Sequence, residues 1–175
     1  MEFMEVVRKR RSIRRYKDKH VPMEKIRRVL EAARLAPSWK NGQCWEYIVV
    51  NDYEKLKELK TGLNKPINAP TFIVACGDPS KSGKHEGKDY YLVDVAISME
   101  HLVLAATNEG LGTCWMGLID EEKIKNLLGI PKKYRVVAVT PIGYPDEGIT
   151  KREKKSLESF VHLDSWGTRL EGKKR

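Results

Sequence analysis

Arginine and serine side chains gather close to the N-terminus, in the stretch Arg10-Arg11-Ser12-Ile13-Arg14-Arg15-Tyr16. Each guanidinium is a planar, permanently charged group whose geometry matches phosphate oxygens. The serine hydroxyl can donate a further hydrogen bond to the same anion. Taken alone, the stretch also fits the solvated basic end of a helix. Two later stretches favour the phosphate-binding interpretation.

The first of these is rich in amide and aromatic side chains, and it reads Ala36-Pro37-Ser38-Trp39-Lys40-Asn41-Gly42-Gln43-Cys44-Trp45. Buried amides must find hydrogen-bond partners, so such a loop indicates a binding role. The alternative is a surface turn in which Asn41-Gly42 only supplies turn geometry. The second stretch, Gly112-Thr113-Cys114-Trp115-Met116-Gly117, follows the longest apolar helix candidate.

Protein nucleophiles and metal ligands are poorly represented. The sequence contains no GxSxG elbow, HExxH pair, GxGxxG fingerprint or P-loop. The three cysteines are far apart and form no pair or cluster with histidines, so no metal site is expected. The three stretches together suit a phosphorylated, planar, hydrogen-bonding ligand, with the chemistry supplied by a cofactor.

The net charge of +9 is concentrated at the two ends of the chain. Residues 1–20 carry +5 and residues 150–175 carry +4, so the middle is neutral. This favours an anionic partner at the ends, which is either nucleic acid or one phosphate held by both ends. No apolar run approaches the ~20 residues needed to span a bilayer, and no signal peptide is recognised. We expect a cytoplasmic protein without a membrane partner.

The elements that must position these stretches are predicted from hydrophobic spacing. We expect strands over 46–50, 71–76 and 134–142, and helices over 2–10, 22–36, 53–60, 90–108 and 121–128. The helix over 90–108 is apolar around most of its circumference, so it must be buried in the core or against another subunit. Residues 77–88 are polar, which predicts a mobile loop or lid. The pattern indicates one α/β or α+β domain over residues 1–175.

The three stretches resemble ordered motifs of the FMN-dependent nitroreductase family. Residues 10–16 resemble its RRSxRxY motif, residues 36–45 resemble APSxxNxQPW, and residues 109–117 resemble EGLGTCWxG. The resemblance runs almost from end to end. It implies an α+β fold with a central, mostly antiparallel sheet flanked by helices. It also implies an intertwined homodimer around the long buried helix, with FMN at the subunit interface.

The resemblance assigns roles to individual residues, and FMN itself rather than a protein side chain would carry the catalysis. Arg10 and Arg11 would hold the FMN phosphate with help from Lys154 or Lys155, and Ser12 would bond the ribityl chain or pyrimidine edge. Arg14 would lie near N1 and O2 of the flavin, where negative charge develops on reduction. The remaining assignments are Pro37, Ser38, Trp39 and Asn41 from the other subunit, Gln43 as a support of that loop, Trp115, Met116 and Gly117 along the isoalloxazine with a backbone N–H near N5, and Lys65 at the pyrimidine end.

Two positions depart from the family pattern. Cys44 replaces the proline that usually precedes Trp45, so the loop loses a restraint on φ while a small thiol fills the volume. The tail reads Lys154-Lys155-Ser156 where an Arg-Lys-Pro is usual, and lysine neutralises a phosphate only as a point charge.

The function implied is an FMN-dependent NAD(P)H oxidoreductase. It would pass hydride by a ping-pong mechanism through FMN to nitroaromatics, quinones or similar small-molecule acceptors, with NADH or NADPH as the reductant. One alternative keeps the flavin and changes the reaction to flavin fragmentation or reductive dehalogenation. An alternative of a different class is a nucleic-acid-binding module that uses the basic ends. The aromatic residues lie in the neutral middle and not among the Lys and Arg residues, so a nucleic-acid partner is not expected.

Overall fold

The computed structural model describes residues 1–148 and 153–170, and within them a four-stranded antiparallel sheet forms the centre. Its strands lie in the order β1 (Trp45–Val50), β2 (Thr71–Gly77), β6 (Arg135–Gly143) and β5 (Gly112–Thr113). This confirms the mostly antiparallel sheet expected from the sequence. The predicted strands correspond to β1, β2 and β6, whereas β5 is too short to produce a periodic signal.

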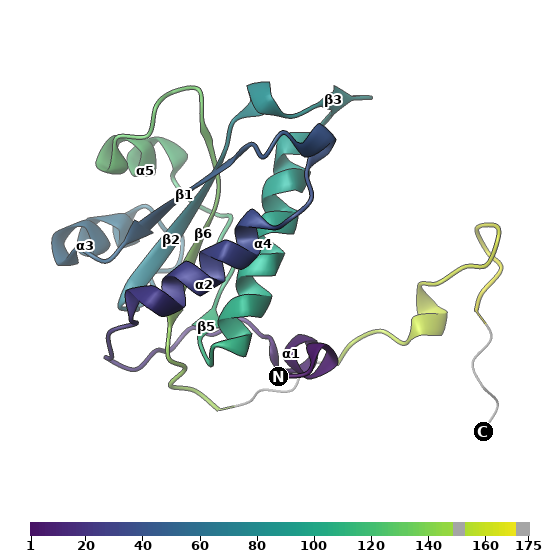
Figure 1. The fold of residues 1–175 in the computed structure, drawn as a ribbon, viewed down its shortest axis with the longest axis horizontal. Coiled ribbons are helices and arrows are strands. Elements are labelled where there is room, and N and C mark those ends of the chain that lie inside the picture. Colours follow the sequence, from purple (N-terminus) through teal and green to yellow (C-terminus); the bar gives the residue numbers. More distant parts are fainter. Residues whose placement is uncertain (149–152, 171–175) are drawn as a thin grey trace.

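Helices cover both faces of the sheet (Figure 1). Helices α2 (Met23–Arg34) and α4 (Tyr90–Asn108) lie on one face, and α3 (Tyr53–Thr61) and α5 (Glu121–Leu128) lie on the other. The N-terminal α1 (Phe3–Lys9) contacts α4. Each of these helices was predicted, and α4 and α5 have the predicted bounds. None of the helices in the described part of the chain combines the length and apolarity needed to cross a bilayer.

Strand β2 shows why both layers are needed. All of its residues are buried, and successive side chains of a strand point to opposite faces. Ile73 and Ala75 belong to the core between the sheet and helices α2 and α4. Phe72, Val74 and Cys76 belong to the second core, under α3 and α5. The continuous apolar run of the sequence therefore correctly predicted a strand covered on both sides.

Short polar side chains fix the ends of the helices on the second face. Asp52 accepts a hydrogen bond from the N–H of Lys55 at the start of α3, and Asp120 accepts one from the N–H of Lys123 at the start of α5. Such caps satisfy backbone donors that the helix itself leaves free. Gly129 ends α5 in the left-handed region, at φ 65°. The start and the end of α5 are therefore both fixed by local backbone and side-chain geometry.

The segment predicted as a lid is a short turn followed by a hairpin. The turn η2 (Pro79–Lys81) is capped by the side chain of Asp78. It leads to β3 (Lys84–His85), which pairs antiparallel with β4 (Lys88–Asp89). The turn and the hairpin give this segment a local structure that its polar composition does not reveal, and its role as a mobile loop or lid stays a prediction.

The C-terminal segment, residues 153–170, runs away from the sheet and its helices (Figure 1). It contains η3 (Leu157–Ser159), and the hydrogen bonds that it makes among the described residues stay within it. Its large apolar side chains are exposed, with Leu157 at 59%, Phe160 at 54% and Trp166 at 91%.

Candidate functional site

The arginine-rich stretch, residues 10–16, is an extended segment that lies along β5. The N–H of Ile13 donates to the carbonyl of Thr113 at 2.8 Å, and Ser12 pairs in parallel with the same residue. Ile13 is 3% exposed, whereas the side chains of Ser12 and Arg14 are exposed. The period-2 alternation of an extended chain thus anchors the stretch with one side chain and presents its neighbours outward.

Glycine permits this close approach between the first and third motifs. A Cβ atom on Gly112 would lie 2.6 Å from Cγ1 of Ile13, which real Cβ atoms do not tolerate. Gly110 follows α4 with a φ of +75°, a conformation that favours glycine. The two glycines of the EGLGTCWxG-like stretch therefore have backbone roles: one turns the chain and the other admits Ile13.

Arg11 lies at the edge of a cavity and carries an unsatisfied donor. Its Nε atom is buried and has no hydrogen-bond partner among the described residues. Its Nη1 donates to the carbonyl of Lys9 at 3.2 Å. The cavity has a volume of about 200 Å³ and is lined by Lys9, Arg11, Ile13, Thr107, Gly110, Leu111, Gly112 and Pro145. A buried, unpartnered guanidinium N–H at the edge of a cavity suits an anion such as a phosphate.

Arg14 is held through its backbone by a carboxylate that sequence reasoning missed. Its N–H donates to Oε1 of Glu147 at 2.7 Å, and Nε of Arg15 lies 3.8 Å from Oε2 of the same residue. The Arg14 side chain itself is exposed. Tyr16 closes the segment by donating its hydroxyl to the carbonyl of Ile13 at 2.6 Å, and burial raises its pKa.

The third motif continues beyond β5 along strand β6. Met116 pairs with Val139 through two backbone hydrogen bonds of 2.9 Å each. The N–H of Met116 is therefore occupied, whereas the backbone N–H groups of Trp115 and Gly117 have no hydrogen-bond partner among the described residues. Met116 is buried at 9% exposure, whereas Trp115 is 41% exposed.

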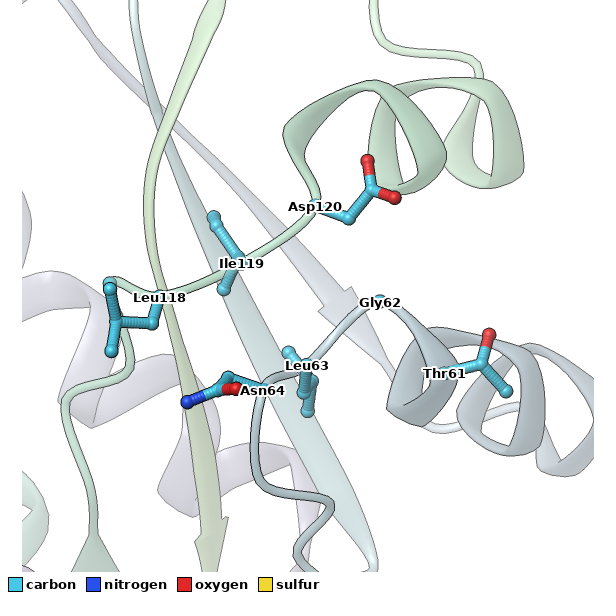
Figure 2. A pocket seen from close by; sticks show the side chains of 8 residues that line it. Thr61, Gly62, Leu63, Asn64, Leu118, Ile119 and Asp120 are labelled. Carbon is cyan, nitrogen blue, oxygen red and sulfur yellow. The ribbon is translucent and has the colours of Figure 1, made fainter.

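The end of this motif meets the loop after α3, which brings Lys65 near Gly117. Leu63 bridges Ile119, and the N–H of Asn64 donates to the carbonyl of Leu118 at 3.2 Å. Lys65 follows directly and is exposed. The two loops border an open cavity of about 500 Å³, which is lined by Thr61, Gly62, Leu63, Asn64, Gly117, Leu118, Ile119 and Asp120. Figure 2 shows the labelled residues of both loops around it.

The second motif lies elsewhere, beside the N-terminal end of α4. Its central residues form η1 (Trp39–Asn41). The N–H of Trp39 donates to Oδ1 of Asp94 at 2.9 Å, and the hydroxyl of Ser38 accepts the N–H of Gln43 at 3.0 Å. The side chains of Pro37, Asn41 and Gln43 are exposed, and those of Ser38 and Trp39 are half-buried.

Cys44, at the position where the family has a proline, is buried at 1% exposure. Burial, with the neighbouring carboxylate of Asp94, raises its thiol pKa to about 12. The thiol therefore fills apolar volume in its neutral form, as expected of a packing residue.

Helix α4 separates this loop from the other two motifs. A helix of 19 residues is about 28 Å long at 1.5 Å per residue. Figure 1 shows β3 near one end of α4 and β5 near the other. Within one chain, the structure thus brings together Arg10, Arg11, Ser12 and Arg14 with Trp115, Met116 and Gly117, and it places the loop 37–43 at a distance from them.

The tail lysines are not joined to the arginines in the described part of the chain. Lys154 and Lys155 are both exposed at the start of the C-terminal segment. No hydrogen bond or ion pair among residues 1–148 and 153–170 links either lysine to Arg10 or Arg11. Their assignment to a phosphate stays a prediction.

Two carboxylates, Asp94 and Glu147, complete the geometry and were not singled out from the sequence. Asp94 had a signal, because it is one acidic residue on the buried face of an otherwise apolar helix, and such a residue needs a polar partner. Glu147 had none, because it lies in a polar stretch after β6 where acidic residues are ordinary.

The chain is similar to known proteins in both sequence and fold. The family model described as "Putative TM nitroreductase" matches residues 2–170. An Archaeoglobus fulgidus protein named as an NADH dehydrogenase/NAD(P)H nitroreductase is 35% identical over 175 residues, which cover 94% of this chain and 99% of that protein. A nitroreductase family protein from Clostridium novyi has a solved structure with a TM-score of 0.80 and 39% identity, covering 97% of each chain.

Further relatives differ in the activity that their names give. An FMN-dependent nitroreductase of Clostridium difficile has a TM-score of 0.82 and 35% identity, covering 93% of this chain and 99% of that chain. Mouse iodotyrosine deiodinase 1 is 29% identical over 195 residues, covering 91% of this chain and 68% of that protein. With a family model matching nearly its whole length, and with the motifs placed as described, this chain belongs to the nitroreductase family.

Proposed function

We propose that this chain is an FMN-dependent NAD(P)H oxidoreductase that reduces a small acceptor such as a nitroaromatic or a quinone. The observation that carries the proposal is the buried, unpartnered Nε of Arg11, in the segment that lies against the third motif. This cationic N–H needs a hydrogen-bond acceptor, and the phosphate of a flavin mononucleotide supplies an anionic one next to a planar ring. The names of the relatives support the same cofactor and reductant.

The residues present fit this cofactor. Arg10 and Arg11 would bind the phosphate, and the exposed hydroxyl of Ser12 would bond the ribityl chain or the pyrimidine edge. Trp115 and Gly117 would lie along the ring, with their free backbone N–H groups directed to N5. When bound, FMN supplies the hydride chemistry between the nicotinamide and the acceptor. The protein would place the ring, exclude water and stabilise charge.

Arg14 would stabilise negative charge at the pyrimidine edge, because its guanidinium is exposed while its backbone is fixed by Glu147. Arg14→Gln should therefore lower the reduction potential of bound FMN more than it weakens FMN binding. Photoreduction against a reference dye measures the first quantity and fluorescence titration the second. A weaker complex with an unchanged potential would show that Arg14 is an anchor and not a charge stabiliser.

The site would be completed by a second copy of the chain. The loop 37–43 presents exposed polar side chains about 28 Å along α4 from the arginines. It would therefore reach the FMN of the partner, whereas Arg10 and Arg11 hold the FMN of their own chain. A second copy would also cover the exposed apolar side chains of α1, such as Phe3 at 65%, and of residues 153–170.

Mixing two inactive variants tests this shared site. In Arg11→Ala both phosphate sites of a dimer are damaged, and in Trp39→Ala both partner loops are damaged. A refolded equimolar mixture contains heterodimers in which one site carries both substitutions and the other carries neither. About one quarter of all sites should then be intact, by random assortment in a two-fold dimer. If FMN binding does not recover in the mixture, the two residues act on the same site from one chain.

The cofactor and the reaction are tested directly on the purified full chain. We expect yellow protein, or tight binding of added FMN, and oxidation of NADH or NADPH with menadione or nitrofurazone as the acceptor. Parallel lines in double-reciprocal plots would indicate the ping-pong mechanism. Colourless protein that does not bind added FMN would overturn the proposal.

Reductive dehalogenation is the second candidate, and the similarity to iodotyrosine deiodinase 1 favours it. Iodotyrosine offered as acceptor to the dithionite-reduced holoprotein separates the two reactions. Release of iodide coupled to flavin oxidation would support dehalogenation, whereas oxidation by nitrofurazone alone would support the first proposal.

A further inference from the structure

The loop 37–43 has a backbone that its own residues do not favour. Lys40, Asn41 and Gln43 adopt φ values of 47°, 57° and 46°. Residues other than glycine rarely occupy this left-handed region, because the Cβ atom crowds the backbone. Such a conformation persists only where the surrounding structure holds it. A group outside the loop must therefore stabilise this conformation.

Hydrogen bonds inside the loop do not attach it to the rest of the protein. Asn41 and Gly42 donate to the carbonyls of Ser38 and Trp39, and Gln43 donates to the hydroxyl of Ser38. Among the hydrogen bonds of the described residues, the bond from the N–H of Trp39 to Asp94 is the one that ties residues 38–43 to another element. The length of this bond is 2.9 Å.

Asp94 gathers three segments around one buried carboxylate. Oδ1 accepts the N–H of Trp39, while Oδ2 accepts the hydroxyl of Ser82 at 2.7 Å and faces the thiol of Cys44 at 3.6 Å. Asp94 is 2% exposed and forms no ion pair with the described residues. A buried carboxylate is costly unless it is hydrogen-bonded. The three neutral donors therefore hold the Asp94 carboxylate in place, and the carboxylate in turn holds the three segments that carry these donors.

Packing of the segment after η2 reinforces the same arrangement. A Cβ atom on Gly83 would lie 2.2 Å from Cε2 of the Trp39 indole, and one on Gly42 would lie 2.1 Å from the carbonyl oxygen of Lys81. The Trp39 ring also contacts Tyr90 at 4.4 Å between centroids. The indole is thus fitted between a glycine and the first turn of α4, with Asp94 fixing its backbone.

We infer that Asp94 is a positioning residue of the flavin site, which holds the loop 37–43 in the conformation that reaches the partner's cofactor. The inference rests on the proposed function, because it assigns a purpose to the loop in FMN binding. Asp94 itself does not touch the cofactor and acts through Trp39. Substituting Asp94 should therefore weaken FMN binding from the far end of α4, without changing Arg10 or Arg11.

The variants are chosen to separate positioning from stability. Asp94→Ala removes all three bonds, and Asp94→Asn keeps an oxygen for Trp39 and exchanges the second oxygen for an amide. Gly83→Ala displaces the indole without altering Asp94. The matched control is Ser98→Ala, one turn further along α4, since Ser98 is fully buried, bonds Tyr47 and the carbonyl of Ala33, and does not touch the loop.

Three quantities are measured on the full chain: FMN affinity, hydrogen exchange of the Trp39 amide without FMN, and melting temperature. We expect Asp94→Ala and Gly83→Ala to raise the FMN dissociation constant by about tenfold or more, with less effect from Asp94→Asn. Exchange of the Trp39 amide should accelerate in Asp94→Ala. Ser98→Ala should lower the melting temperature while leaving FMN affinity and Trp39 exchange unchanged.

The outcomes separate the two hypotheses. A wild-type chain that does not bind FMN overturns the proposed function and the inference with it. If Asp94→Asn and Gly83→Ala bind FMN as tightly as the wild-type chain does, the inference is overturned and the proposed function stands. Ser98→Ala could also lose FMN affinity in proportion to its loss of stability, and to the same degree as the Asp94 variants. That result would show that Asp94 has a merely structural role, and it would also overturn the inference.

Discussion

Replacing Arg11 by methionine should change FMN binding and stability in opposite directions. The Nε atom of Arg11 is buried and unpartnered in the chain without ligand, and such a donor costs about 1–3 kcal/mol. The substitution also removes the bond from Nη1 to the carbonyl of Lys9, which contributes about 0.5–1.5 kcal/mol. The cost of the unpartnered donor exceeds the contribution of the lost bond, so the ligand-free variant should be more stable by about 1 kcal/mol. Methionine is chosen because it retains the apolar stem of the arginine side chain.

The effect on the cofactor has the opposite sign. If Arg11 binds the FMN phosphate, its loss removes charge-assisted bonds that contribute about 1.5–3 kcal/mol. This corresponds to a loss of FMN affinity of about 10- to 150-fold. The melting temperature of the ligand-free protein should meanwhile rise by about 2–4 °C, the shift expected for 1 kcal/mol in a domain of this size.

The assay combines fluorescence titration with FMN and thermal unfolding of ligand-free protein. The matched control is Arg27→Met, because Arg27 is exposed on α2 and makes no hydrogen bond or ion pair with the described residues. It should change neither quantity. An Arg11→Met chain that is destabilised without FMN and binds FMN normally would refute the reasoning, since Arg11 would then be a structural residue.

Two other predictions concern a close contact and a buried carboxylate. Gly112→Ala should weaken FMN binding in fluorescence titrations, because its Cβ would collide with Ile13 and displace the arginine-rich segment. Gly148→Ala, where a Cβ would meet nothing, is the control, and equal affinities would contradict the contact. The pKa of Asp78 is lowered, chiefly by the hydrogen bond from the Ser80 hydroxyl. Its ionised form therefore stabilises the fold above the unfolded-state pKa of about 4, and this contribution is lost as the pH falls below that value. Melting temperatures between pH 7 and pH 2.5 should fall less steeply in Asp78→Asn, and an identical slope would exclude this role.

Most of the secondary structure follows from local patterns. Helices α4 and α5 have the predicted bounds because their apolar spacing is visible in the sequence. Strand β2 follows from an apolar run between proline and glycine. The turn after β2 could not be predicted, because it depends on the side-chain bonds to Asp78, and the two-residue strands of the hairpin that follows are too short for a periodic signal.

The candidate site also has features that the sequence alone predicts and features that depend on the tertiary structure. The sequence by itself determined which residue types are present: guanidinium groups for an anion, glycines for tight backbone and an amide-rich loop. Their resemblance to three ordered motifs identified the family from the sequence alone, and the matching family model confirmed it. Each motif is contiguous, so its chemistry can be read without knowing the fold.

Only the tertiary structure decided how the motifs are arranged. It placed residues 10–16 against β5, left Arg11 Nε without a partner, and put the loop 37–43 at the other end of α4. It also revealed Glu147 and Asp94, which hold two of the motifs through backbone N–H groups. These contacts join residues far apart in the chain, and such contacts are fixed by packing in three dimensions, which no local pattern encodes.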